Sequence, residues 1–177
     1  SYIQPRVLIE MGARSLTEPA EEREVISFID SEYAQLPFAQ KATKVNVVVP
    51  TRTFIEKVLL LHEEFLKPID HIRNERLSRH LYDIDRLADS EYAHRAYEDH
   101  SLFEHIVAHR KAVTPLRNIS YEFHKRDTLH IIPPTEVLND WEQDYKAMQQ
   151  NMIIGDSKSF PDLLERMKEV MQNFKTN

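Results

Sequence analysis

The sequence predicts an α+β fold in which a small sheet is followed by a mainly helical bundle. Strand-like segments occur only before residue 50, and helical spacing of apolar residues dominates after it. The 177 residues include only two glycines, too few for folds that depend on glycine-rich turns. We therefore divide the chain into residues 1–50 and 51–177.

Two strands are predicted in the first part, over residues 5–13 and 44–50. In the first, "PRVLIEMGA", apolar side chains recur at every second position, as on one face of a strand. The second, "KVNVVVP", is rich in β-branched valine and ends at Pro50. Residues 18–36 predict a helix between these strands, because acidic residues gather in its expected first turn.

Five helices are predicted in the second part, over residues 52–67, 77–88, 91–112, 135–150 and 159–174. Thr51 or Thr53 can cap the first of these helices, and Ser159 can cap the last. The prolines of "HIIPPTE", at 130–136, end one element and begin the next.

Composition excludes several classes of protein. The formal net charge of −6 argues against a general nucleic-acid coat protein. The absence of cysteine excludes disulfides and thiol chemistry. No apolar run approaches the ~18 residues of a membrane span, and the first residues lack a signal-peptide pattern. We expect a cytoplasmic protein that does not bind membranes.

Lys57 lies at the edge of the apolar stripe predicted for helix 52–67. A helical wheel places Glu56 on the opposite side, toward solvent. A lysine in such a position usually buries its stem and leaves its ammonium in water. The stripe itself contains Phe54, Ile55, Val58, Leu59, Leu61, Phe65 and Leu66.

Asp83 in helix 77–88 lies near several cations. Arg79 precedes it by four residues, His80 by three, and Arg76 falls on the same flank. One interpretation is a surface ion-pair cluster that contributes a few tenths of a kcal/mol. The other is an ionised aspartate at the rim of a cleft, and the pattern alone leaves both open.

Three other motifs are weaker candidates for a site. Asp83 and Asp85 lie ~160–200° apart on a helix and cannot share a metal ion there. The loop "IIGDSKSF", 153–160, has no strand before it, as a phosphate loop requires. His105 and His109 have helical two-ligand spacing, but no third ligand is evident, and we expect most histidines on polar helix faces.

Several segments together resemble one known family. These are "PRVLIEMGARSLTEP", "VVVPTRTFIEKVLLLHEE", "RLSRHLYDIDRL" and "DYKAMQQNMIIGDSKSFPDLLERM". They are similar to the C-terminal part of the AbiEii-like nucleotidyltransferase toxins, found in bacterial toxin–antitoxin and abortive-infection systems. The resemblance implies that residues 1–50 are a remnant of an α/β nucleotidyltransferase core and that 51–177 form its helical C-terminal region.

The resemblance also assigns site residues. The family's third motif, a lysine on a helix after a strand, is matched by "TFIEK" and implies a catalytic Lys57. Its fourth motif, Arg-Asp-x-x-Asp-Leu, is matched by "RHLYDI" and implies roles for Arg79 and Asp83, although His80 stands where that motif has its first acid. With the catalytic Lys57 and Asp83, we assign substrate binding to Arg73, Arg76, Arg79 and His80, and metal binding to Glu10.

Under this resemblance Mg²⁺ and a nucleoside triphosphate serve the intact protein, and we expect neither to bind tightly to this chain. The partners that it implies are an antitoxin and a tRNA or other RNA. The family's glycine–serine loop and paired metal-binding acids are not in the sequence. We expect them upstream and expect this chain alone to transfer no nucleotide.

Two alternatives are a non-catalytic module that binds antitoxin or RNA, marked by an exposed apolar patch, and a histidine-based metal hydrolase. If the chain has the function that this resemblance implies, Lys57 and Asp83 lie close together at a cleft. Glu10 then faces the same cleft, Arg76 or Arg79 lies at its rim, and Asp85 points away from it.

Overall fold

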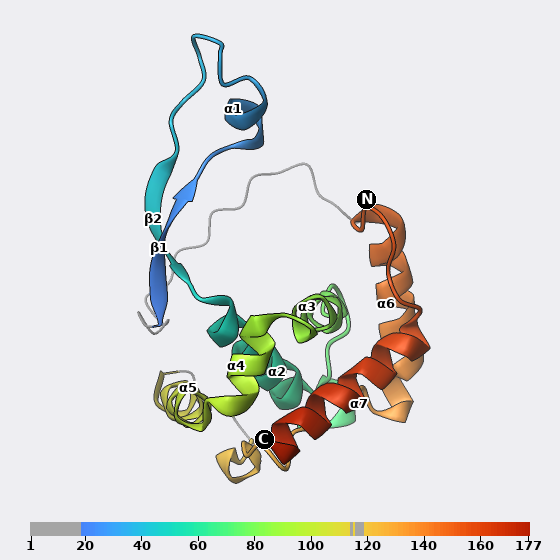
Figure 1. Cartoon of the computed structure of the whole chain (residues 1–177). Helices are drawn as coiled ribbons and strands as arrows, with labels where there is room; N and C mark the ends of the chain where they lie inside the picture. The colour runs from blue at the N-terminus through green and yellow to red at the C-terminus, as the bar shows by residue number, and fades with distance from the viewer. Residues whose placement is uncertain (1–18, 114, 116–118) are drawn as a thin grey trace. The chain divides into compact units, whose positions relative to one another are not determined.

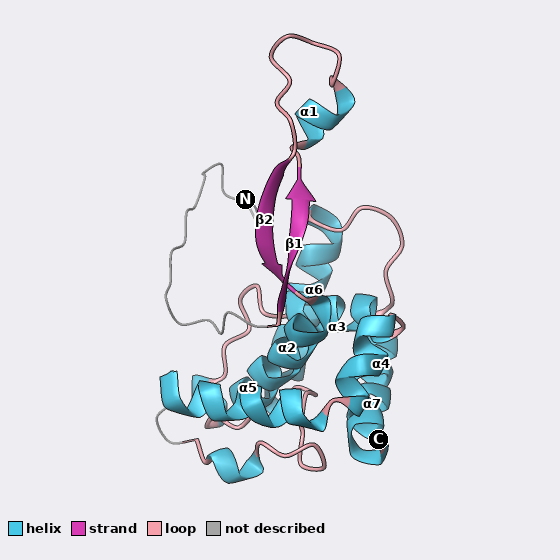
Figure 2. Ribbon diagram, turned by 60° about the vertical axis from the view of Figure 1, so that its left-hand side comes forward, coloured by secondary structure: helices cyan, strands magenta, loops and turns pink. Residues whose placement is uncertain are grey.

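The computed structural model describes residues 19–113, 115 and 119–177. Contacts divide the described chain into a small unit, residues 19–49, and a larger unit that begins at Pro50. The predicted α+β class is confirmed, because the small unit contains an antiparallel two-stranded sheet and the larger one is helical (Figure 2). The predicted strand over residues 5–13, with Glu10, lies outside the described residues.

The small unit is a β-hairpin with a short helix in its connection. Strands β1 (Ala20–Val25) and β2 (Thr43–Val48) pair so that Ala20 faces Val48. Helix α1 (Phe28–Glu32) begins after Ser27, whose hydroxyl accepts a hydrogen bond from the backbone of Asp30. The strand predicted over 44–50 is confirmed as β2.

The helix predicted over residues 18–36 is wrong. Residues 20–25 pair with the valine-rich β2 instead, and α1 covers only five of the expected positions. The Lys44 ammonium lies 2.8 Å from a carboxylate oxygen of Glu22 across the hairpin. Pairing with a distant strand therefore outweighs the acidic residues that suggested a helix start.

Six α-helices form the described part of the larger unit, and α2 lies among several of them (Figure 1). Helix α2 contacts α3, α4 and α5, and α3 also packs against α7. Ser159 caps α7 as predicted, accepting a hydrogen bond from the backbone of Asp162. The helices are α2 (Pro50–Phe65), α3 (Arg79–Ala88), α4 (Glu91–Glu98), α5 (His100–Val113), α6 (Leu138–Asn151) and α7 (Phe160–Thr176).

The single helix predicted over residues 91–112 is two helices, and Asp99 separates them. The backbone of Asp99 is not helical, with φ −88° and ψ 80°. Its carboxylate accepts a hydrogen bond of 2.8 Å from the backbone N–H of Leu102, in the first turn of α5. An aspartate that bonds to backbone in this way favours a helix start over a helix interior.

The apolar stripe predicted for α2 forms the core. Five of its side chains are fully buried, Phe65 is nearly so, and Leu66 is half-buried. The ring of Phe65 packs 4.8 Å from that of Trp141 on α6, and Phe54 stacks on Phe174 of α7 at 6.0 Å. The stripe thus joins α2 to helices that are distant in the sequence.

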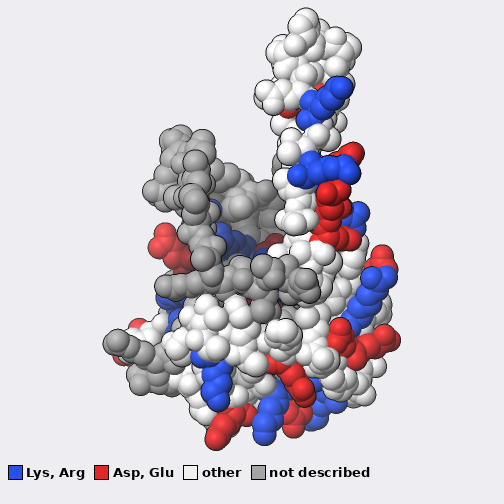
Figure 3. All heavy atoms as spheres, turned by 90° about the vertical axis from the view of Figure 1, so that its left-hand side faces the viewer, with Lys and Arg blue, Asp and Glu red and all other residues white. Residues whose placement is uncertain are grey.

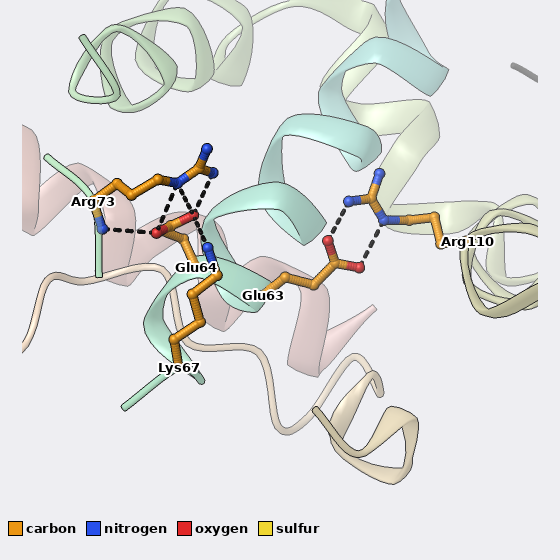
Figure 4. A network of polar contacts seen from close by, with 5 residues as sticks. All are labelled: Glu63, Glu64, Lys67, Arg73 and Arg110. Atoms are coloured by element: carbon orange, nitrogen blue, oxygen red, sulfur yellow. Dashed lines mark hydrogen bonds and ion pairs between the residues drawn. The ribbon is translucent and has the colours of Figure 1, made fainter. Parts of the chain in front are cut away.

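Two consecutive glutamates at the end of α2 are buried and paired with cations (Figure 4). Glu63 accepts hydrogen bonds from the guanidinium of Arg110, on α5. Glu64 accepts from Lys67 and from both the backbone and the side chain of Arg73. Burial raises the pKa of Glu64, but these hydrogen bonds outweigh it and the pKa lies below its usual value.

Asp144 on α6 holds the turn that leads into α3. Its carboxylate accepts hydrogen bonds from the backbone N–H of Arg76, at 2.7 Å, and of Ser78, at 3.1 Å. It also accepts one from the hydroxyl of Ser78, a residue with no exposed surface. Arg76 has a positive φ of 58°, which side chains disfavour, so these bonds fix an otherwise unfavourable turn.

Replacing Asp144 with alanine should destabilise the protein by about 2 kcal/mol, because the buried Ser78 loses its acceptor. Urea unfolding followed by fluorescence of Trp141, the single and fully buried tryptophan, measures this change. Asp140→Ala, at an exposed position on the same helix, is the control and should cost less than about 1 kcal/mol. Equal effects of the two substitutions would contradict the role of Asp144.

Candidate functional site

Lys57 and Asp83 form an ion pair between α2 and α3. The Lys57 ammonium nitrogen lies 2.6 Å from a carboxylate oxygen of Asp83, although 26 residues separate them. Their side chains are 23% and 37% exposed, so the pair remains accessible from solvent. The predicted convergence is confirmed, and Lys57 ends on a carboxylate instead of extending into water.

His80 lies beside this pair and is mostly buried. Its Nδ1 is 3.9 Å from the same carboxylate oxygen of Asp83. Burial, together with the positive charges of Lys57 and Arg79, lowers the pKa of His80 to about 4. His80 is therefore neutral near pH 7, and it adds no positive charge to the site.

The three arginines expected to bind substrate have different surroundings. Arg79 is exposed at the start of α3 and lines a pocket together with Asp83. The guanidinium of Arg73 instead bonds to Glu64, and the backbone of Arg76 bonds to Asp144. Arg76 or Arg79 was predicted at the rim of the site, and Arg79 is the one that lines the pocket.

The pocket has a volume of about 280 Å³ and joins a charged wall to an apolar one. Its residues come from α3, the end of α6 and the loop that follows. The apolar wall was not predicted from the sequence. The run "MII", residues 152–154, just after the predicted helix 135–150, was the available signal for it. The lining residues are Arg79, Tyr82, Asp83, Met148, Met152, Ile153 and Ile154.

Asp85 belongs to a different interaction, as predicted from its position on the helix. It is buried, and its carboxylate lies 2.9 Å from the Lys158 ammonium and 3.6 Å from the Arg166 guanidinium. These cations come from α7 and the loop before it, so Asp85 helps to attach α3 to that helix. Asp85 therefore points away from the Lys57–Asp83 pair, as predicted.

Glu56 differs from expectation, and three histidines are buried. Glu56 is only partly exposed, because it pairs with the buried Arg52 at 2.9 Å. Six of the nine histidines are exposed or half-buried, in line with the expectation for most of them, whereas His62, His80 and His124 are buried. His62 accepts the backbone N–H of His130 at Nδ1 and therefore donates from Nε2 to the carbonyl of Phe123, which attaches a loop to α2.

The described residues offer no place for a metal ion. Within residues 19–113, 115 and 119–177, no group of three or more histidine, aspartate or glutamate side chains could hold one. Glu10, the predicted metal ligand, lies outside these residues, so its role stays a prediction. Among the same residues, no helix is both long and apolar enough to cross a membrane.

One protein family matches most of the chain. The family model for the nucleotidyl transferase AbiEii toxin of type IV toxin–antitoxin systems matches residues 1–166. The chain belongs to this family. No curated protein and no solved structure matches it. For this AbiEii family member, the resemblance drawn from the motifs around Lys57 and Asp83 is confirmed, while the roles of individual residues and the expected upstream motifs stay predictions.

The stability of this AbiEii family member should fall as the pH drops from about 6.5 to about 4. The pKa of both His62 and His80 is lowered to about 4, for His62 chiefly by burial and the nearby His124. In that range the unfolded chain binds protons that the folded chain does not. Each histidine then lowers the free energy of unfolding by about 1.4 kcal/mol per pH unit.

Urea unfolding at several pH values tests this, with His80→Gln expected to reduce the slope and His71→Gln, at an exposed position, to leave it unchanged. An unaltered slope in His80→Gln would show that His80 titrates normally in the folded protein.

Proposed function

We propose that Lys57 and Asp83 belong to the active site of a toxin that transfers a nucleoside monophosphate from a nucleoside triphosphate to an RNA or protein acceptor. The observation that supports this most is the 2.6 Å ion pair between Lys57 and Asp83, which lie in the two segments that resemble motifs of the AbiEii family. A conventional surface ion pair would not require these two segments to converge at the edge of a pocket.

In the proposed reaction an acceptor hydroxyl oxygen attacks the α-phosphorus. The new bond to the acceptor forms as the bond to pyrophosphate breaks, and the leaving pyrophosphate takes up the developing negative charge. Lys57 stabilises that charge with its ammonium group. Asp83 holds the ammonium in position through their ion pair, and the proton of the hydroxyl passes to water or to Asp83.

Arg79 is the second cation of the proposed site, because it is exposed in the pocket wall that contains Asp83. A planar guanidinium can donate two parallel hydrogen bonds to phosphate oxygens. Arg73 is less suited to this role, since Glu64 already accepts its donors. No step is assigned to Mg²⁺, because the described residues include no set of ligands for it.

Nucleotide binding by the purified chain tests the site. Equilibrium dialysis with each of the four labelled nucleoside triphosphates should show binding that Lys57→Ala weakens at least about tenfold, through loss of one charge-assisted contact. Lys146→Ala is the matched control, because Lys146 also pairs with a carboxylate, Glu142, but is not one of the residues that line the pocket.

The same two substitutions, placed in the chromosomal gene, test the activity in cells. Growth arrest and transfer of α-phosphate label to RNA or protein should disappear with Lys57→Ala and persist with Lys146→Ala. Nucleotide binding or label transfer that survives Lys57→Ala unchanged would refute the assignment.

A second role, binding of a protein partner, is favoured by the small unit. Phe28 is 95% exposed, and the same unit exposes Ile29 and Phe38. Charged side chains follow its strands, whereas the end that includes α1 is mostly uncharged on the face shown in Figure 3. The family is part of a toxin–antitoxin system, and we propose that this apolar surface contacts the antitoxin.

Phe28→Asp should therefore abolish co-purification of the antitoxin with the tagged chain without changing its stability, because Phe28 has almost no buried surface. Phe123→Asp, also at an exposed phenylalanine but in the larger unit, is the control and should retain the partner. Full retention by Phe28→Asp would exclude this surface.

A further inference from the structure

We infer that the pocket beside Asp83 binds the nucleobase of the nucleoside triphosphate, an assignment that rests on the proposed function and extends it. The pocket combines two chemistries that a nucleotide also combines. Asp83 and Arg79 line one wall, and methionine and isoleucine side chains line the other. A free phosphate would make no favourable contact with the apolar wall, and a purely apolar ligand would leave the charged wall without a partner.

The apolar wall has a suitable composition for a flat aromatic ring. Met148, nearly fully buried, and Met152 contribute flexible thioethers, which make favourable contacts with aromatic groups. Ile153 is half-buried and Ile154 is fully exposed, so this wall holds more apolar surface than the folded chain covers. A base placed here would remove that surface from water.

The exposed Ile154 precedes a glycine with an unusual backbone conformation, in the loop after α6. Gly155, the next residue, has φ +89°, a conformation that other residues rarely adopt. Among the described residues, none besides Gly155 and its two chain neighbours has a heavy atom within 4 Å of the position that a Cβ would occupy there. The space beside Gly155 is therefore open, next to the fully exposed Ile154. Met152 and Ile154 can be changed there without disturbing the buried core.

The other wall orients the ligand with respect to Lys57. Asp83 lines the pocket and at the same time bonds to the Lys57 ammonium at 2.6 Å. A base between Arg79 and the methionines would thus leave its attached phosphates toward the proposed catalytic lysine. The guanidinium of Arg79 can stack on the face of the base or bind a phosphate oxygen.

A combined Met152→Gln and Ile154→Gln substitution tests this inference, because it removes apolar surface without adding charge. Equilibrium dialysis compares binding of each nucleoside triphosphate, of tripolyphosphate and of a single-stranded RNA trinucleotide. The unchanged protein should bind at least one nucleoside triphosphate about tenfold more tightly than tripolyphosphate. The double substitution should remove most of that difference and leave tripolyphosphate binding unchanged.

Ile69→Gln combined with Val113→Gln is the control, because these residues are 42% and 40% exposed, similar to Met152 at 41%, and neither lines the pocket. It should not alter binding of any of the three ligands.

The outcomes separate this inference from the proposed function. If Lys57→Ala weakens binding but the double substitution does not, the catalytic site stands and the base pocket is refuted. If the double substitution weakens binding of the trinucleotide alone, the pocket belongs to the acceptor and the assignment to the triphosphate is wrong. If no nucleoside triphosphate binds the unchanged protein, both proposals fail.

Discussion

Burial of α2 on several sides is the constraint on which the larger unit depends. Its apolar stripe faces the core, and the two glutamates near its end are also withdrawn from water. A buried carboxylate needs a cation, so Glu63 requires Arg110 of α5 and Glu64 requires Arg73 from the turn before α3. Two neighbouring segments are therefore attached to α2 by charge as well as by packing (Figure 4).

This constraint explains why the chain between α2 and α3 can hold an unfavourable turn. Glu64 fixes its first part through Arg73, and Asp144 fixes its second part through Arg76 and Ser78. The axis of α3 is thereby set before its first residue, and Asp83 follows one helical turn after Arg79. An ion pair with the partly exposed Lys57 adds little stability by itself, so its geometry is better understood as a result of the anchored turn than as its cause.

What the sequence could predict was determined by local periodicity. The stripe of α2, the cap of α7 and the separation of Asp83 from Asp85 all follow from helical geometry within a few turns. The hairpin was missed because "AEEREV" becomes a strand only by pairing with residues 43–48, which no local pattern reveals. The run "MII" was a local signal for an apolar surface, but only tertiary packing brings the end of α6 to the side of α3 that carries Asp83.

The charge of the site differs in sign from that of the whole chain. The chain has a formal net charge of −6, whereas Lys57, Arg79 and Asp83 together leave one cation in excess. His80 stays neutral because burial and the same two cations oppose its protonation, so it does not compete with Lys57 for Asp83 as a cation. An anionic ligand would be attracted by these few residues and not by the field of the whole surface. Such a site is better suited to a small phosphate compound that binds through a few contacts than to a long nucleic acid that binds along its backbone.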